Sequence, residues 1–268
     1  MLIIQPSGGL CNRMRVINSA WELAKKRKER LIVLWYLCPE LNCPFEALFR
    51  PVKEIRIINI RSLADPRKLF YQLIARQRFG NDDILNHKTD GILHRDFYES
   101  LKNPVYLFTW EHFYPSHDYH FYVPSAPLQK RIDLLTASFQ KRCVGVHIRR
   151  TDNTVSMGKS TTEQFIALMK LELDRHPETC FFLATDDNKE EALLRKTFPG
   201  RIISNELRVQ DRNSVEGMQD ALIDLWCLAA CCKIIGSYWS SFTDTAADMR
   251  GIEKVIAGAE EEDNSNEG

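Results

Sequence analysis

Two kinds of hydrophobic pattern follow each other at the start of the chain. Residues 2–5 are mostly apolar and are followed by Pro6-Ser7-Gly8-Gly9. Apolar residues then recur at steps of three and four, the spacing of an amphipathic helix, at Leu10, Met14, Ile17, Trp21 and Ala24. Residues 31–35 are continuously apolar, as in a strand that is buried on both faces of a parallel sheet. The pattern predicts a strand, a glycine turn, a helix and a second strand.

Further strands are expected over residues 52–60 and 105–110, whereas residues 61–100 give no clear pattern. Pro115, Pro124 and Pro127 follow one another closely, and such proline-rich stretches often separate domains. We therefore expect a first domain over residues 1–124 and a second over 125–258. The acidic residues 259–268 are expected to form a disordered tail.

The second half alternates strand and helix patterns. Val144, Val146 and Ile148 alternate along one predicted strand. Ser160 to Glu163 has capping-box spacing before a helix that stops at His176-Pro177. The later elements are strands at 180–184, 201–204, 234–237 and 253–257, and helices at 189–197, 218–232 and 242–250. Alternation of this kind predicts an α/β fold with doubly wound parallel sheets, two of which would face a cleft.

Composition narrows the class of protein. With 268 residues, 44% hydrophobic and 27% charged, the chain is long enough for two folded domains. Its 36 basic residues balance its 36 acidic ones, whereas nucleic-acid binding usually needs a strongly basic domain. The most apolar stretch, residues 222–239, contains Asp224 and Lys233, which argues against a transmembrane helix. We expect no nucleic-acid partner and no transmembrane segment.

Cysteine and histidine spacings do not indicate a metal site. The eight cysteines lack paired zinc-ligand spacing, and no export signal is visible, so we expect reduced core thiols in a cytoplasmic protein. His112, His117 and His120 lie in an aromatic-rich stretch without a familiar ligand pattern. Packing, or a wall beside a ligand, is favoured for them over metal binding.

In doubly wound sheets, ligands bind beyond the carboxyl ends of the strands, which selects four regions of this chain. In the first, Gly8 and Gly9 would let a ligand approach the backbone, and the following helix offers amides to an anion. The alternative is that this glycine pair only makes a tight turn.

The second region is the end of the strand that contains His147. Strand alternation would place His147 and Arg149 on the same side, and an arginine there can grip two phosphate oxygens. Asp152 is a candidate to orient an arginine or to act as a base. The alternative is an ordinary salt bridge between Arg150 and Asp152.

The third and fourth regions contain carboxylates and serines. Asp186 and Asp187 are adjacent rather than an Asp-x-Asp metal pair, and one of them is expected to cap the next helix. Asp224 lies on a different face from the apolar stripe of its helix, where it is either a ligand-binding group or a surface aspartate. The segment Ser240-Ser241-Phe242 opens a helix and either holds a phosphate or simply caps that helix.

Four motifs occur in one order in the second half, and they resemble those of GDP-fucose-dependent fucosyltransferases. They are Gly-Val-His-Ile-Arg-Arg-Thr-Asp from position 145, Phe-Leu-Ala-Thr-Asp-Asp from 182, Leu-Ile-Asp-Leu-Trp-Cys-Leu from 222 and Ser-Tyr-Trp-Ser-Ser-Phe from 237. The resemblance is greatest to the α1,6 branch, with related motifs in the α1,2 and protein O-fucosyltransferases. It spans about residues 143–249, and residues 8–13 resemble the family's first glycine loop.

The resemblance implies an inverting, metal-independent glycosyltransferase with two Rossmann-like domains, the GT-B arrangement, and no cofactor besides the donor GDP-fucose. The first domain would face a glycan acceptor and the second would hold the nucleotide sugar. The implied roles are β-phosphate binding by Arg149, guanine or ribose contact by His147, guanine-edge binding by Asp224, phosphate binding by Ser241 and the Phe242 amide, and sugar-phosphate contact by Asn12. The remaining expected ligand contacts are Gly8, Gly9, Arg13, Arg150, Asp186 and Ser240, and the expected catalytic residues are Arg149, Asp152 and Asn12.

One departure from the family pattern concerns the general base. The α1,6 enzymes carry a glutamate and a lysine shortly after the arginine motif, where this chain has Met157 and Asn153. Asp152 is the candidate substitute. Three other functions stay open: transfer from another nucleotide sugar, non-catalytic binding of a nucleotide sugar or glycan, and a phosphatase-like hydrolysis, which the lack of an evident nucleophile disfavours.

Overall fold

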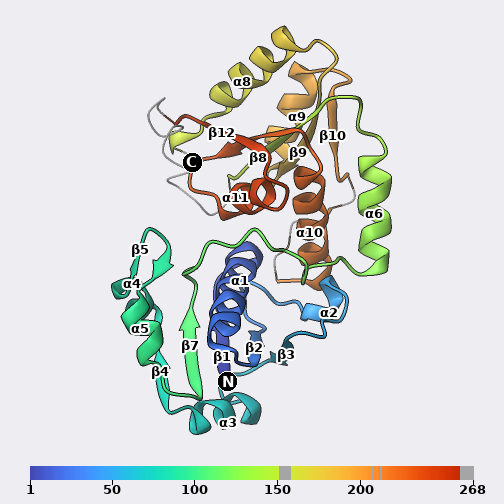
Figure 1. The fold of residues 1–268 in the computed structure, drawn as a ribbon. Coiled ribbons are helices and arrows are strands. Elements are labelled where there is room, and N and C mark those ends of the chain that lie inside the picture. Colours follow the sequence, from blue (N-terminus) through green and yellow to red (C-terminus); the bar gives the residue numbers. More distant parts are fainter. Residues whose placement is uncertain (151–157, 207, 210, 212, 260–268) are drawn as a thin grey trace. The chain divides into compact units, whose positions relative to one another are not determined.

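The structure is a computed structural model that describes residues 1–150, 158–206, 208–209, 211 and 213–259 (Figure 1). It divides into two compact units, the first being Met1–Ser125 with Asp211–Gln219 and the second Ala126–Gln210 with Asp220–Gly268. Asp152, Asn153 and Met157 lie outside the described residues, as does nearly all of the expected tail.

The first unit is built on a parallel five-stranded sheet in the order β3-β2-β1-β7-β4. The strands are β1 (Leu2–Pro6), β2 (Leu31–Tyr36), β3 (Arg56–Ile60), β4 (Gln77–Phe79) and β7 (Val105–Thr109). The helices are α1 (Leu10–Arg27), α2 (Phe45–Leu48), α3 (Pro66–Ile74), α4 (Asn81–Asn86) and α5 (Arg95–Ser100), and β5 (Lys88–Thr89) pairs with β6 (Ile92–Leu93) as a small hairpin.

The second unit has another parallel five-stranded sheet, in the order β10-β9-β8-β11-β12. Its strands are β8 (Cys143–Ile148), β9 (Cys180–Thr185), β10 (Ile202–Ser204), β11 (Lys233–Ser237) and β12 (Glu253–Ala257). Its helices are α6 (Ala126–Thr136), α8 (Thr162–Arg175), α9 (Asn188–Thr197), α10 (Val215–Ala229) and α11 (Ser241–Asp248). The predicted α/β class with parallel sheets is confirmed.

The patterns at the start of the chain are confirmed by β1, α1 and β2. All five residues of β1 are buried, and α1 turns Leu10, Met14, Ile17 and Ala24 into the core. The strand expected from residue 52 begins only at Arg56, and Lys53 and Glu54 before it are exposed.

The starts of α8 and α10 differ from the prediction in an instructive way. The capping box of α8 is Thr161 with Gln164, one residue later than expected, because the Ser160 hydroxyl is bonded instead to the Ala257 carbonyl at 2.6 Å. Helix α10 covers 215–229 rather than 218–232. The amide of Gly217 donates to the Ser214 hydroxyl at 3.0 Å, which satisfies an amide of the first turn.

The strands of the second sheet are buried on both faces. All six residues of β8 are buried, and Val144, Val146 and Ile148 pack in one cluster with Phe165 of α8. The side chains of Val144, Val146 and Ile148 therefore lie on one face of the sheet, and the opposite face of β8 is buried as well.

Six of the cysteines are buried, as expected for small core residues: Cys11, Cys43, Cys143, Cys180, Cys227 and Cys231. Among the described residues, no helix combines the length and the apolar character that a membrane span requires.

Candidate functional site

In each parallel sheet there is one point on either side of which the chain connections lead outwards in opposite directions. In the first sheet this point lies between β1 and β7, and in the second between β8 and β11. Ligands of doubly wound sheets bind beyond the carboxyl ends of the strands at such points. The loop after β1 is the predicted glycine loop, and the segments after β8 and β11 contain Arg149 and Ser240. Topology and motif thus select the same loops.

In the first unit, the glycine loop turns the chain from β1 into α1. Gly8 has φ +79°, in the left-handed region that residues with a side chain rarely adopt. A Cβ at this position would lie 3.1 Å from the side-chain Nδ2 atom of Asn12. Gly9 is the N-cap of α1 and provides no side-chain cap. Asn12 accepts a hydrogen bond from Arg15 at 3.2 Å. The glycine pair therefore makes a tight turn, as one of the two alternatives states. The amides in the first turn of α1 also receive no side-chain hydrogen bond from Gly9.

Arg13 supports this loop from inside the protein. Its side chain is fully buried, and its guanidinium donates to the Gly8 carbonyl at 2.7 Å and to the Tyr36 carbonyl at 2.5 Å. The third nitrogen donates to the Cys38 sulfur at 3.0 Å, and the guanidinium lies 5.2 Å from the centre of the Trp35 ring. Burial lowers the pKa of Arg13. Arg13 therefore positions the glycine loop, whereas the sequence suggested only a ligand contact.

In the second unit, His147 is buried at the end of β8. Its Nδ1 is 2.9 Å from the Thr243 hydroxyl and 3.4 Å from the Ser240 hydroxyl. Its ring lies 4.8 Å from the Phe242 ring at an interplanar angle of 30°. The structure therefore brings together three of the predicted site residues: His147, Ser240 and Phe242.

Ser237, the last residue of β11, joins the two central strands at their carboxyl ends. Its hydroxyl donates to the His147 carbonyl at 3.2 Å and accepts from the Arg149 amide at 3.0 Å. Strand β8 ends at Ile148, so the strand alternation that paired the His147 and Arg149 side chains does not extend to Arg149. The backbone of Arg149 is instead fixed by Ser237.

The loop between β11 and α11 carries backbone strain and an open helix start. Trp239 has φ +51° and is 75% exposed, an uncommon conformation for a bulky residue that recurs at functional sites. Ser240 occupies the N-cap of α11 but makes no side-chain cap bond. Simple N-capping by the Ser240 hydroxyl, one of the two alternatives, is therefore excluded. Ser241 and Phe242 form the first turn of α11.

Arg150 and Asp186 brace the neighbouring strand ends. The Arg150 amide donates to Asp186 at 2.7 Å, which links the segment after β8 to the segment after β9. The Arg150 guanidinium pairs with Glu190 at 2.6 Å and donates to the Ser160 carbonyl at 2.8 Å. Its partners are thus on α9 and beside α8. Asp187 caps α9 by accepting from the Lys189 amide at 2.7 Å, which confirms the capping prediction.

Asp224 lies inside the second unit and is not a surface aspartate. It is 7% exposed, and the neighbouring Leu222, Ile223 and Leu225 on α10 are fully buried. Burial is the main cause that raises the pKa of Asp224 to about 7, with Asp220 and Glu191 adding to it and Arg208 opposing it. Within the described part of the chain, its Oδ1 has no hydrogen-bond partner.

The two carboxylates near Asp224, those of Asp220 and Glu191, have hydrogen-bond and ion-pair partners, and in this respect they differ from Asp224. Asp220 accepts from Arg131 at 2.6 Å and from the Val209 amide at 2.7 Å. Glu191 is held by Arg208 and by Arg195, the latter at 2.9 Å. A buried carboxylate oxygen without a donor is costly, and such groups are common where a ligand supplies the donor.

Sequence reasoning missed three residues of this site. Ser237 and Thr243 tie the strand ends and α11 to His147, and Gly236 makes room for this, because a Cβ on it would lie 2.2 Å from a Thr243 carbon. The available signal was a glycine followed by a small polar residue at the end of a buried strand. Among the described residues, no group of three or more His, Cys, Asp or Glu side chains has metal-binding geometry.

No protein-family model matches the sequence, and no curated protein matches it. Solved structures do. The chain is similar to NodZ α1,6-fucosyltransferase from Bradyrhizobium, soaked with GDP-fucose, at 18% identity and TM-score 0.63 over 92% of each chain. It is also similar to POFUT1 in complex with GDP-fucose, at 13% identity and TM-score 0.63 over 97% of this chain and 98% of that one.

A mutant of Arabidopsis thaliana FUT1 in complex with GDP is a further neighbour, at 12% identity and TM-score 0.64 over 95% of this chain and 69% of that one. At these identities the likeness concerns the fold. In its fold, the chain is similar to fucosyltransferases whose structures hold GDP-fucose or GDP.

Proposed function

We propose that this protein is a glycosyltransferase that moves fucose from GDP-fucose to a hydroxyl group of a glycan. The observation that carries the proposal is the arrangement at the end of β8 and β11, where His147, Ser237, Ser240 and Thr243 form one hydrogen-bonded group beside Arg149. The fold shared with NodZ and POFUT1, whose structures contain GDP-fucose, supports the choice of donor.

The chemistry of the reaction explains why these residues suit the donor. Breaking the bond between fucose and phosphate builds positive charge on the sugar and negative charge on the departing GDP. In our proposal, Arg149 and the amides of Ser241 and Phe242 at the start of α11 stabilise the charge on the phosphate. The arginine stays charged at any working pH. Transfer would then be metal-independent and would need no cofactor besides the donor.

The second element of the proposal is recognition of the base. Guanine presents two adjacent donors, N1–H and the exocyclic amine, and one carboxylate can accept both. Among the described residues, no donor reaches the Oδ1 atom of Asp224, which matches this need. We propose that Asp224 binds the guanine edge and that His147, tied to Thr243, contacts the base or ribose.

The first unit would face the acceptor, and the Gly8-Gly9 turn with Asn12 would approach the sugar-phosphate. An acceptor hydroxyl that attacks opposite the departing GDP inverts the configuration of the sugar carbon. Asp152 is our candidate for the base that takes its proton. The buried thiols are in keeping with a cytoplasmic location.

The test is a thermal-shift screen of GDP-fucose, GDP, UDP, ADP and other nucleotide sugars, followed by assays of fucose transfer and donor hydrolysis. A ligand at 100 times its dissociation constant stabilises a protein by about 2.7 kcal/mol. We expect GDP and GDP-fucose to stabilise the protein most, and GDP release to require an acceptor glycan. Preference for UDP or ADP would overturn the choice of donor, and tight GDP-fucose binding without turnover would identify a binding protein.

A further inference from the structure

Helix α3 presents apolar side chains on two opposite sides. Through Tyr71 it packs in the cluster that contains Ile3, Ile32, Leu34, Ile58, Ile60 and Tyr106 of the first sheet. On its outer side Leu69 is 49% exposed, Phe70 55% and Leu73 78%. Pro66, Leu69, Phe70 and Leu73 follow the helical spacing of three and four residues, so they form one continuous stripe.

This stripe is unusual for a helix at the surface of a soluble unit. Leu63, in the preceding loop, is 57% exposed and adds to the same short stretch of chain. Lys68, in contrast, is buried, and its ammonium donates to the Leu63 carbonyl at 3.2 Å. Clustered exposed apolar side chains mark a contact with a partner or a membrane more often than isolated ones do.

The surroundings of the stripe are strongly basic, although the chain as a whole is neutral. From Glu54 to Phe79 the sequence contains six basic residues and two acidic ones, and the acidic ones are Glu54 and Asp65. Asp65 is already paired with Arg67 at 2.7 Å. The basic residues are Arg56, Arg61, Arg67, Lys68, Arg76 and Arg78.

Two of these arginines lie on the same side of the sheet as α3. Arg56 shares the strand parity of Ile58 and Ile60, which pack against Tyr71. Arg78 is paired in register with Tyr106, another member of that cluster. Both arginines are exposed, and they come from β3 and β4, the two edge strands of the sheet.

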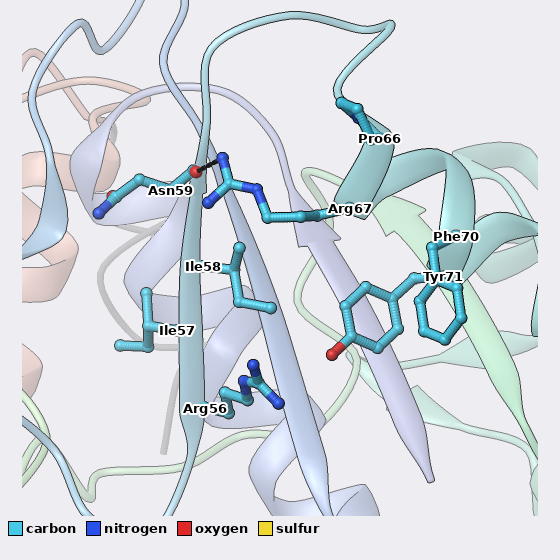
Figure 2. Close-up of a pocket in the computed structure, with 8 residues that line it drawn as sticks. All are labelled: Arg56, Ile57, Ile58, Asn59, Pro66, Arg67, Phe70 and Tyr71. Carbon is cyan, nitrogen blue, oxygen red and sulfur yellow. Dashed lines mark hydrogen bonds between the residues drawn. The ribbon is translucent and has the colours of Figure 1, made fainter.

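Figure 2 shows a groove between β3 and α3 on this side, with Arg56 at one end and Arg67 reaching the Asn59 carbonyl at 2.7 Å. The groove has a volume of about 670 Å³, and Phe70 and Tyr71 contribute its aromatic wall. Apolar side chains therefore lie next to the exposed Arg56, whereas Arg67 is held by Asp65 and by the Asn59 carbonyl.

We propose that this surface, the α3 face formed by Arg56, Arg67, Leu69, Phe70, Leu73 and Arg78, docks the protein on an anionic lipid bilayer. A helix with an exposed apolar stripe and flanking basic residues binds at the interface of a bilayer with its stripe among the acyl chains. Juxtaposed arginines gain from the negative surface potential of anionic lipids. Docking of this kind requires no membrane-spanning helix and does not depend on the proposed transferase activity.

A second copy of the chain is a poorer match for the same face. Pairing around a two-fold axis would bring the basic edges of two copies to one interface, where like charges repel each other. An anionic surface satisfies the apolar and the charged parts of the face together.

The test is sedimentation of the full chain with vesicles of phosphatidylcholine alone or mixed with phosphatidylserine. We expect binding to the mixed vesicles only, weakened by added salt because salt screens exposed charges. Leu73→Glu should lower the partition coefficient by roughly tenfold or more. Arg56→Gln and Arg78→Gln should each lower it about fivefold, the effect of one interfacial basic residue.

Matched controls come from the second unit. Leu134, on α6, is 67% exposed, and Arg175 is an exposed arginine at the end of α8. Leu134→Glu and Arg175→Gln should leave vesicle binding unchanged. Loss of vesicle binding in the α3-face variants alone, with unchanged thermal unfolding, would support the proposal. Absence of wild-type binding, equal binding to neutral vesicles, or a dimer that Leu73→Glu dissociates without any vesicle binding would each overturn it.

Discussion

The Nδ1 atom of His147 and the hydroxyl of Thr243 are 2.9 Å apart, and this contact ties the end of β8 to the first turn of α11. Gly236 permits it, since a Cβ at this position would lie 2.2 Å from a Thr243 carbon. The start of α11 is therefore held against the two central strands of its sheet by side chains and not only by the connecting loop.

Replacing Gly236 by alanine should destabilise the protein, because the added methyl group meets Thr243 inside the packed unit. We expect a loss of about 1–3 kcal/mol in the free energy of unfolding, the usual cost of overpacking. Urea unfolding measures this loss. Gly80→Ala is the matched control, since the nearest atom to its Cβ is 3.8 Å away. Equal losses in the two variants would contradict the close approach of α11 to β11.

Arg149→Lys tests the proposed phosphate contact while it keeps the positive charge. A lysine cannot reproduce the planar two-pronged contact of a guanidinium with two phosphate oxygens. Loss of one such donor to the transition state lowers the turnover roughly 100- to 1,000-fold. Steady-state transfer from GDP-fucose is the measurement, and near-normal turnover of the lysine variant would remove Arg149 from the phosphate site.

Fucose transfer should survive EDTA. We assign the charge of the departing GDP to Arg149 and to the amides of α11. The measurement is GDP release with and without chelator, and then with added manganese. Activity that falls with EDTA and returns with manganese would show that a metal ion takes the role we give to these groups.

The stability of the protein should depend on pH through Asp224. Burial raises the pKa of Asp224 from 3.8 to about 7 in the folded protein. A group whose folded pKa is raised stabilises the fold below its unfolded pKa, and this contribution is lost as pH rises to the folded pKa. Relative to Asp224→Asn, the wild type should therefore lose stability between about pH 4 and pH 7.

Urea unfolding of both proteins at pH 5 and pH 8 gives the difference directly, and Asp174→Asn, at an exposed position of α8, controls for the loss of a carboxylate. From pH 5 to pH 8, the free energy of unfolding of Asp224→Asn should rise relative to that of the wild type. A difference that does not change with pH would contradict the raised pKa of Asp224.

The same substitution should weaken selection of the base. If Asp224 accepts from N1–H and the amine of guanine, Asp224→Asn leaves one acceptor and brings an N–H against a donor. We expect the preference for GDP over ADP to fall by about 1–3 kcal/mol. Competition binding with GDP, ADP and UDP measures it. Unchanged preference in the variant would remove Asp224 from the base site but would leave the donor assignment intact.

The fold could be read from the sequence where local patterns coincide with burial. The continuous apolar runs of β2 and β9 and the spacing of α1 each correspond to one covered surface. The stretch 61–100 could not be read, because it forms short elements whose apolar residues are divided between the core and the surface. Helix α3 illustrates this, since Tyr71 is buried while Leu73, two residues later, is 78% exposed.

The candidate site could be predicted loop by loop but not contact by contact. Doubly wound sheets bind ligands beyond the carboxyl ends of their strands, and that rule selected the loops after β1, β8, β9 and β11. It gives no direction for a given side chain. Arg13 has the charge of a ligand-binding residue, yet it bonds inward to the Gly8 and Tyr36 carbonyls because α1 turns it towards β2. Only tertiary packing decides between these two uses of an arginine.

The assignment of Asp211–Gln219 to the first unit affects how the protein folds during its synthesis. Asn42 donates to the Asn213 carbonyl and Gln219 donates to the Ala47 carbonyl, both at 3.0 Å. The ribosome makes Ala126–Gln210 before it reaches these partners. The Ala47 carbonyl therefore lacks its hydrogen bond from Gln219 until most of the second unit has been synthesised. A fragment that stops at Ser125 would never form this bond.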